Sequence, residues 1–213
     1  MMDSLMYYGR MKTLLDPFIA ALIFMVTLPL MVLIALLVAA SIRQNPFFSR
    51  RRALALGGRE FTLFKFRTMS EADTRTLLSV NVADVAKVFL KPSSSNAVPP
   101  VCRFLRRTGL DELPQLLNIM KGEMSIIGPR PLDLYDLRIL AEADPQMNER
   151  RKNLPVLPGI TGLWQIYGKR SQGLKNLISL DEEYVLSLSF GLDLRILLET
   201  FRRMVLANFE EPV

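Results

Sequence analysis

Residues 17–42 form an uncharged, almost wholly apolar run, and this run limits what the 213-residue chain can fold into. As one straight helix the run would be about 39 Å long at roughly 1.5 Å per residue, which exceeds the bilayer core of roughly 30 Å. Pro29 stands near its middle. Proline removes a backbone donor, so we expect the helix to be kinked or broken there into two arms, each too short to cross a bilayer alone.

The charges that flank this run favour a re-entrant hairpin over a transmembrane span. Arg10 and Lys12 precede the run. A richer group of arginines follows it, namely Arg43, Arg50, Arg51, Arg52 and Arg59. Basic residues tend to stay on the cytoplasmic side, and a hairpin returns both ends there. A kinked span stays open as the alternative. A secretory signal is disfavoured, because its apolar region usually runs about 7–15 residues.

The composition excludes several kinds of chemistry. The sequence has no histidine, so acid–base catalysis and metal binding by histidine are ruled out. Its single cysteine, Cys102, cannot form an internal disulfide and is expected to be a small buried hydrophobe. A net charge of +6 fits an anionic membrane surface or phosphorylated substrates. A nucleic-acid partner is not expected, because 21 acidic residues accompany the basic ones and no long basic stripe occurs.

From residue 43 onward the pattern predicts one cytosolic domain of the α+β class, dominated by helices, with residues 1–42 as its membrane anchor. Residues 59–69 alternate apolar and polar side chains, which indicates a half-buried strand after a Gly57-Gly58 turn, and so a short β-hairpin. We expect Phe61, either Leu63 or Phe64, and Phe66 to face the core. Lys65 and Arg67 are expected together on the opposite face.

Further elements follow from composition and periodicity. Helices are predicted over 70–90, 113–120, 133–153 and 192–206, loops over 92–100 and 155–162, and a short strand over 163–167. The helix over 192–206 is amphipathic. It can pack on the domain or lie in the membrane interface, and the sequence leaves both open.

Two adjacent carboxylates, Asp111 and Glu112, are the best candidates for chemistry. Thr108 to Asp111 has the spacing of a capping box, so the pair is expected near the positive end of a helix dipole, which favours ionised carboxylates and bound phosphate. An ionised aspartate facing a phosphoanhydride is a potential nucleophile. Its repulsion from phosphate would be relieved by Mg²⁺ on the neighbouring carboxylate. Arg130, between Pro129 and Pro131, is suited to a rigidly aimed phosphate contact.

Several motifs occur together in one order and spacing. They are the apolar run with its proline, Lys65–Met69, Leu105–Leu116, Gly128–Pro131, Pro158–Gln165, Gly168 and Leu180–Val185. In this arrangement the chain resembles the bacterial sugar transferase family, the monotopic phosphoglycosyl transferases, over most of its length. It resembles their minimal form.

The resemblance implies a reaction. A sugar-1-phosphate moves from a nucleoside diphosphate sugar, usually UDP-linked, to polyprenyl (undecaprenyl) phosphate at the cytoplasmic face of the bacterial inner membrane. UMP leaves, and surface glycan assembly begins. The expected partners are therefore a UDP-sugar, polyprenyl phosphate and the lipid bilayer, and the resemblance allows a homodimer.

The resemblance also implies site residues. Asp111 is expected to be the nucleophile that forms a phosphosugar intermediate. Glu112 is expected to bind Mg²⁺, with Asp111 as the second carboxylate. The expected substrate-binding residues are Lys65, Arg67, Arg106, Arg130, Arg170 and Asp181.

Two positions depart from the family pattern. Leu28-Pro29 stands where a Ser-Pro pair is usual, and the hydroxyl of Thr27 is a candidate to satisfy the carbonyl that the proline leaves free. Gly109 stands where serine is common.

The alternative function is a non-catalytic membrane adaptor of a polysaccharide machine, which would need neither metal nor nucleotide. The presence of Asp111, Glu112 and Arg130 disfavours it, because binding alone does not require all three.

Overall fold

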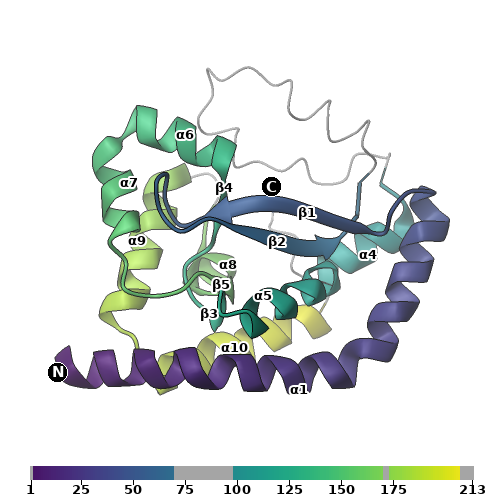
Figure 1. Ribbon diagram of the computed structural model, residues 1–213, viewed down its shortest axis with the longest axis horizontal. Coiled ribbons are helices and arrows are strands. Elements are labelled where there is room, and N and C mark those ends of the chain that lie inside the picture. The colour runs from purple at the N-terminus through teal and green to yellow at the C-terminus, as the bar shows by residue number, and fades with distance from the viewer. Residues whose placement is uncertain (1, 70–97, 170–172, 207–213) are drawn as a thin grey trace.

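The computed structural model describes residues 2–69, 98–169 and 173–206, and its dominant element is the long N-terminal helix α1 (Met2–Ile42). Figure 1 shows α1 running along the base of the molecule and then turning upward along one side. Pro17 and Pro29 both lie inside this continuous helix. Within the described part of the chain, only α1 is long and apolar enough to cross a bilayer, over Tyr8–Ile42. The re-entrant hairpin stays a prediction.

The predicted β-hairpin is confirmed. Strand β1 (Phe47–Ala53) pairs antiparallel with β2 (Phe61–Phe66), and β4 (Leu132–Asp133) joins the other edge of β1. A second, parallel pair consists of β3 (Ser125–Ile127) and β5 (Gly159–Thr161). Gly57 in the connection between β1 and β2 has a φ of 76°, in the left-handed region that glycine adopts most readily.

Helices surround the two small sheets, so the predicted α+β, helix-dominated class is confirmed. They are α4 (Pro100–Thr108), the 3₁₀ helix η1 (Leu110–Gln115), α5 (Leu116–Met120), α6 (Leu134–Ala143), α7 (Pro145–Lys152), α8 (Leu163–Tyr167), α9 (Gly173–Leu186) and α10 (Phe190–Val205). The charged segment 133–153 is helical as predicted, but it divides at Asp144, which caps α7. The helix predicted over 70–90 and most of the loop over 92–100 lie outside the described residues.

The short strand predicted over 163–167 is wrong, because these residues form helix α8. Five residues are too few for apolar alternation to distinguish a strand from a helix turn. Gly168 ends the helix with its N–H on the Trp164 carbonyl, 2.8 Å away. A Cβ on Gly168 would meet that carbonyl oxygen at 2.3 Å, so only glycine fits there.

One stripe of α1 packs on the domain, both in the first half of the helix and in the second half. Ala20 lies in an apolar cluster with Phe61 of β2 and Leu116 of α5. Further along, Ile34 and Val38 join a cluster that contains Phe66 and Leu105. Many other apolar side chains of α1, among them Phe18, Leu22, Val26 and Leu36, are exposed. The helix therefore carries one buried stripe and a broad apolar surface that faces outward.

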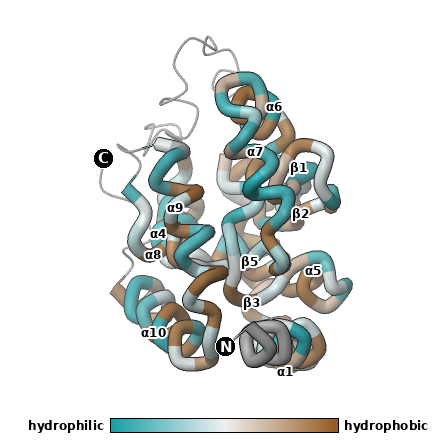
Figure 2. Tube along the Cα trace, turned by 90° about the vertical axis from the view of Figure 1, so that its left-hand side faces the viewer, coloured by the Kyte–Doolittle hydropathy of each residue, from teal (hydrophilic) through white to brown (hydrophobic). Residues whose placement is uncertain are grey.

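Helix α10 confirms the predicted amphipathic helix, and its apolar face is the exposed one. Its exposed apolar side chains are Phe190, Leu194, Leu197, Leu198, Phe201 and Val205. In contrast, Asp193 is buried beside Ile196. Figures 1 and 2 both show α10 beside α1 at the base of the molecule. The two helices therefore present apolar side chains on the same side of the molecule.

The hydroxyl of Thr27 does not satisfy the carbonyl that Pro29 leaves free, as had been suggested from the sequence. Pro29 lacks an N–H and so leaves the Met25 carbonyl without its usual helical donor. Thr27 Oγ1 donates instead to the Ile23 carbonyl at 2.7 Å. This back-bonding to the preceding turn is typical of threonine in helices and tends to bend them.

Candidate active site

The carboxylate pair lies on η1, directly after a sharp reversal of the chain. Helix α4 ends at Gly109, whose φ of 71° is left-handed, and η1 follows at once. The predicted capping box is wrong: Thr108 Oγ1 donates back to the Phe104 carbonyl at 2.9 Å, and no side chain caps η1. Glycine at 109 makes this reversal possible, because a side chain there would strain the backbone.

The structure brings Asp111, Glu112 and Lys65 together. Asp111 is only 6% exposed, Glu112 is half-buried, and η1 packs on β2, which carries Lys65. Burial lowers the pKa of the Lys65 ammonium, and the charges of Asp111 and Glu112 act against that lowering. A lysine beside two carboxylates at the edge of a pocket is suited to hold an anion close to them.

Lys65 lies on a different strand face from the one predicted. The predicted burial of Phe61, Leu63 and Phe66 is confirmed. Because side chains alternate along a strand, Lys65 shares its face with Leu63, and both line the same pocket. The expectation that Lys65 points away from the core face is therefore wrong.

An open pocket adjoins the carboxylates. Its walls come from β1, β2, η1, the turn after β3 and β5, and they consist of Arg52, Leu63, Lys65, Glu112, Gln115, Arg130, Pro131, Gly159 and Ile160. Three cationic side chains therefore face one carboxylate. Such a balance favours a ligand that carries several negative charges. The sequence interpretation missed Gln115, and it treated Arg52 only as part of the basic flank of the apolar run.

The turn that carries Arg130 is held by close backbone contacts between β3 and β5. Gly128 N donates to the Thr161 carbonyl at 2.9 Å, and Gly159 N donates to the Pro129 carbonyl at 2.9 Å. A Cβ on Gly159 would lie 2.1 Å from Gly128 N, so this approach requires glycine. These hydrogen bonds fix the turn against the sheet, and its two prolines restrict its backbone further.

A buried ion pair lies behind Arg130. Arg151 is 1% exposed, and its guanidinium pairs with Asp181 while Nη2 donates to the Arg130 carbonyl at 2.7 Å. Its Nε donates to the Leu54 carbonyl, also at 2.7 Å. Burial raises the pKa of Asp181 to about 6, against the lowering by Arg151. Asp181 is therefore an interior partner of Arg151 rather than part of the pocket lining.

Two other predicted site residues, Arg67 and Arg106, are not among the described residues that line the pocket. Arg67 Nε donates to the Asn45 carbonyl at 2.9 Å, near the start of β1. Arg106 is half-buried in the last turn of α4. Arg170 lies outside the described residues. The structure thus gathers Lys65, Glu112 and Arg130, with Asp111 adjacent in η1.

The donor set of the site fits Mg²⁺. Over residues 2–69, 98–169 and 173–206, no cluster of three or more aspartate, glutamate or cysteine side chains is placed to form a complete protein cage for a metal. Mg²⁺ is commonly held by one or two carboxylates, with water and substrate phosphates as its other ligands. Asp111 and Glu112 supply such a pair.

The cysteine prediction is also confirmed. Cys102 is fully buried in α4, and burial raises the pKa of its thiol. A buried thiol of raised pKa is a poor nucleophile. The carboxylates are therefore the stronger candidates for covalent chemistry.

Comparison with known proteins places the chain in a family. The model for "Bacterial sugar transferase" matches residues 7–207. A UDP-glucose:undecaprenyl-phosphate glucose-1-phosphate transferase of Xanthomonas campestris pv. campestris is 34% identical over 93% of this chain, which spans 40% of that protein. The exopolysaccharide production protein ExoY of Sinorhizobium fredii is 35% identical over 94% of this chain and 88% of its own length.

A third relative is also a sugar transferase by name. The uncharacterized sugar transferase EpsL of Bacillus subtilis is 36% identical over 77% of this chain and 72% of its own length. The family model matches nearly all residues of the chain, and the pocket is likewise lined by residues from motifs that lie far apart in the sequence. This chain belongs to the bacterial sugar transferase family.

Proposed function

We propose that this protein transfers a sugar-1-phosphate from a UDP-sugar to polyprenyl (undecaprenyl) phosphate through a covalent intermediate on Asp111, and that this begins assembly of an exported glycan. The observation that carries the proposal is the pocket, where Lys65, Arg130 and Glu112 converge beside Asp111. The names of the relatives support the substrates: one acts on UDP-glucose and undecaprenyl phosphate, and another serves exopolysaccharide production.

The first step forms the intermediate. A carboxylate oxygen of Asp111 attacks the phosphorus that bears the sugar, and the bond from that phosphorus to the bridging oxygen breaks as UMP leaves. Lys65 and Arg130 offset the charge of the diphosphate, which would otherwise repel the nucleophile. Mg²⁺ held by Glu112, with Asp111 adjacent, would supply further charge neutralisation at the phosphates.

The second step returns the enzyme to its starting state. A phosphate oxygen of the polyprenyl carrier attacks the same phosphorus, and the acyl phosphate bond to Asp111 breaks. The product is a polyprenyl diphosphate sugar, and the Asp111 carboxylate is free again.

Contacts near the start of α1 support a re-entrant anchor. Lys12 Nζ lies 2.6 Å from Asp193 of α10, and Asp16 accepts hydrogen bonds from Ser125 Oγ and from Ile126 N of β3. The residues that precede the apolar run are thus bound to the same body as those that follow it. A helix that spans the bilayer would separate them by about 30 Å.

The exposed apolar faces of α1 and α10 support placement of the site at the membrane surface. The two helices lie beside each other at the base of the molecule (Figure 2), and each carries exposed apolar side chains. Leu113, two residues from Asp111, packs in the clusters that contain Ala20 and Met31 of α1. The nucleophile would therefore lie close to the level of lipid phosphates. With the basic residues on either side of the run, this favours the cytoplasmic face of the inner membrane.

The test is UMP release by the purified protein from a panel of UDP-sugars, with Mg²⁺ and polyprenyl phosphate. We expect release from at least one UDP-sugar, and loss of that release in Asp111→Asn while the variant still inserts in membranes. Metal-dependent release would also eliminate the non-catalytic adaptor. Release at the wild-type rate by Asp111→Asn would contradict the covalent mechanism.

A further inference from the structure

Three consecutive arginines on β1 have different surroundings. Arg50 Nη1 lies 2.9 Å from Asp133 Oδ2, and Arg51 Nη2 lies 2.6 Å from Glu60 Oε2. Arg52 is the third, and it lies 3.8 Å from the same Asp133 Oδ2. Among the described residues, the first two arginines therefore have a carboxylate at hydrogen-bond distance, and Arg52 has only a longer ion pair.

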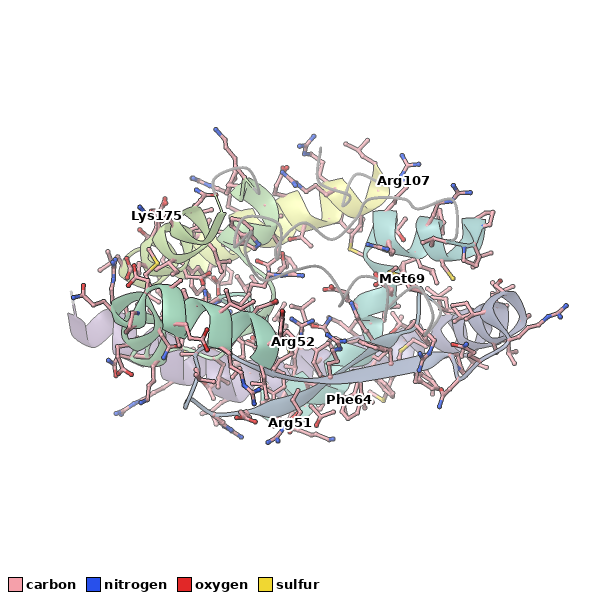
Figure 3. The ribbon with its side chains drawn as sticks, turned by 90° about the horizontal axis from the view of Figure 1, so that it is seen from above. Arg51, Arg52, Phe64, Met69, Arg107 and Lys175 are labelled. Atoms are coloured by element: carbon pink, nitrogen blue, oxygen red, sulfur yellow. The ribbon has the colours of Figure 1, made fainter. Side chains whose placement is uncertain are left out.

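Arg52 is placed at the pocket rather than at the surface. Its side chain is 16% exposed and lines the pocket together with Lys65 and Arg130. Figure 3 shows Arg51 and Arg52 pointing to opposite sides of the strand. Arg51 faces solvent, with a side chain that is 70% exposed. The alternation of β1 thus directs one arginine outward and the next to the site.

One nitrogen of Arg52 lacks a partner. Its Nε is buried and has no hydrogen-bond acceptor within the described structure. Buried donors nearly always have a hydrogen-bond acceptor. A ligand in the pocket could supply the acceptor for this nitrogen. Burial lowers the pKa of the guanidinium, and Asp133 partly counters this lowering. An anion at the pocket would counter it further.

We propose that Arg52 is a further substrate-binding residue, whose guanidinium donates hydrogen bonds to the diphosphate oxygens of the nucleotide sugar. This inference rests on the proposed function and assigns a third cation to the same diphosphate. Arginine presents its donors in a rigid fork that matches phosphate oxygens, whereas lysine acts as a point charge. Arg52 and Arg130 would therefore orient the diphosphate, with Lys65 close to the nucleophile.

The experiment measures binding without turnover. Isothermal titration of the detergent-solubilised full chain with Mg²⁺-UDP, and separately with Mg²⁺-pyrophosphate, compares wild type with Arg52→Gln, Arg52→Lys and Arg50→Gln. Pyrophosphate makes the result independent of which sugar is transferred. Arg50→Gln is the matched control, because it removes the same charge from the same strand at a residue that does not line the pocket.

We expect Arg52→Gln to bind both probes about 10-fold to 100-fold more weakly, as for the loss of charge-assisted hydrogen bonds. Arg52→Lys should lie between it and the wild type, and Arg50→Gln should stay within about twofold of the wild type. Thermal unfolding reports whether each variant is folded. If Arg52→Gln does not fold, Arg52→Lys decides, because it keeps the charge and the stem but loses Nε.

The outcomes separate this inference from the proposed function. If wild type binds neither probe, the proposed function fails and the role of Arg52 fails with it. If wild type binds and the folded Arg52 variants bind equally well, only the assignment of Arg52 is overturned. An equal loss in Arg50→Gln would also overturn it, because the effect would then be one of net charge alone.

Discussion

The Arg151 guanidinium donates a hydrogen bond from Nη2 to the Arg130 carbonyl at 2.7 Å. The same guanidinium pairs with Asp181 of α9 and donates to the Leu54 carbonyl after β1. One buried side chain thus connects the turn that carries Arg130 with α9 and with the residue that follows β1. Because Arg130 stands between two prolines, fixing its carbonyl also fixes the direction in which its own side chain leaves the backbone.

Arg151→Ala should destabilise the fold by about 3–5 kcal/mol, because it leaves the Asp181 carboxylate buried without its partner. Arg150→Ala is the matched control. Arg150 is the preceding residue in α7, and its ion pair with Glu182 is exposed to solvent, so its loss should destabilise the fold far less than the loss of Arg151. Denaturant unfolding in detergent measures both. Equal effects of the two substitutions would refute the structural role of Arg151.

The raised pKa of Asp181 predicts a specific pH dependence of stability. Its pKa of about 6 in the folded protein exceeds the ordinary value of about 3.9, so the folded state binds the proton more tightly than the unfolded state. The stability that this proton contributes is complete below pH ~4 and is lost as the pH rises through about 6. Wild type should therefore lose up to about 3 kcal/mol relative to Asp181→Asn between pH ~4 and ~7.

Unfolding free energies of wild type and Asp181→Asn at several pH values check this expectation. The comparison is one of slopes, so an overall destabilisation of the variant does not affect it. A gain of the wild type relative to the variant over the same interval would show that the Arg151 charge, rather than burial, dominates the ionisation of Asp181.

The re-entrant anchor predicts that the start of α1 is inaccessible from outside the cell. Arg10 is exposed and precedes the apolar run, and the native Cys102 is fully buried, so Arg10→Cys gives a specific probe. An impermeant thiol reagent should label this cysteine only after the cells are opened. Arg43→Cys, at the other end of the run, should behave in the same way. Labelling of residue 10 in intact cells would show that α1 spans the membrane.

The exposed face of α10 predicts contact with lipid. Leu198 is 62% exposed on that face, whereas Tyr135 is 40% exposed on α6, which lies away from the base in Figure 1. In a Trp164→Phe background, brominated lipids in nanodiscs should quench a tryptophan at position 198 and leave one at position 135 unaffected. Equal quenching at the two positions would contradict the placement of α10 in the membrane interface.

The sequence predicted the parts of the fold that depend on local patterns. The alternation over residues 59–69 located β2, and the apolar spacing over 192–206 located α10. The motif at residues 128–131 indicated a rigid turn around Arg130, and Arg130 lines the pocket. These features depend on short-range periodicity and on proline and glycine, whose effects act within a few residues.

Features that depend on contacts between distant segments could not be predicted. Arg151 and Arg130 meet only because β1, the turn after β3 and α7 converge, and nothing near residue 151 in the sequence signals this contact. In the sequence, Arg52 is one of several arginines that follow the apolar run. Only the pairing register of β1 shows that its side chain lies at the pocket. The orientation of α10 was left open because periodicity identifies an apolar face but not what covers it.

The most direct test of the central claim is detection of the phosphosugar on Asp111. Wild-type protein is incubated with Mg²⁺ and a UDP-sugar that supports UMP release, without a polyprenyl acceptor, and its intact mass is measured. We predict a gain equal to one sugar phosphate, localised to Asp111 by peptide mapping, with no gain in Asp111→Asn. UMP release without any adduct, or an adduct that persists in Asp111→Asn, would contradict the account.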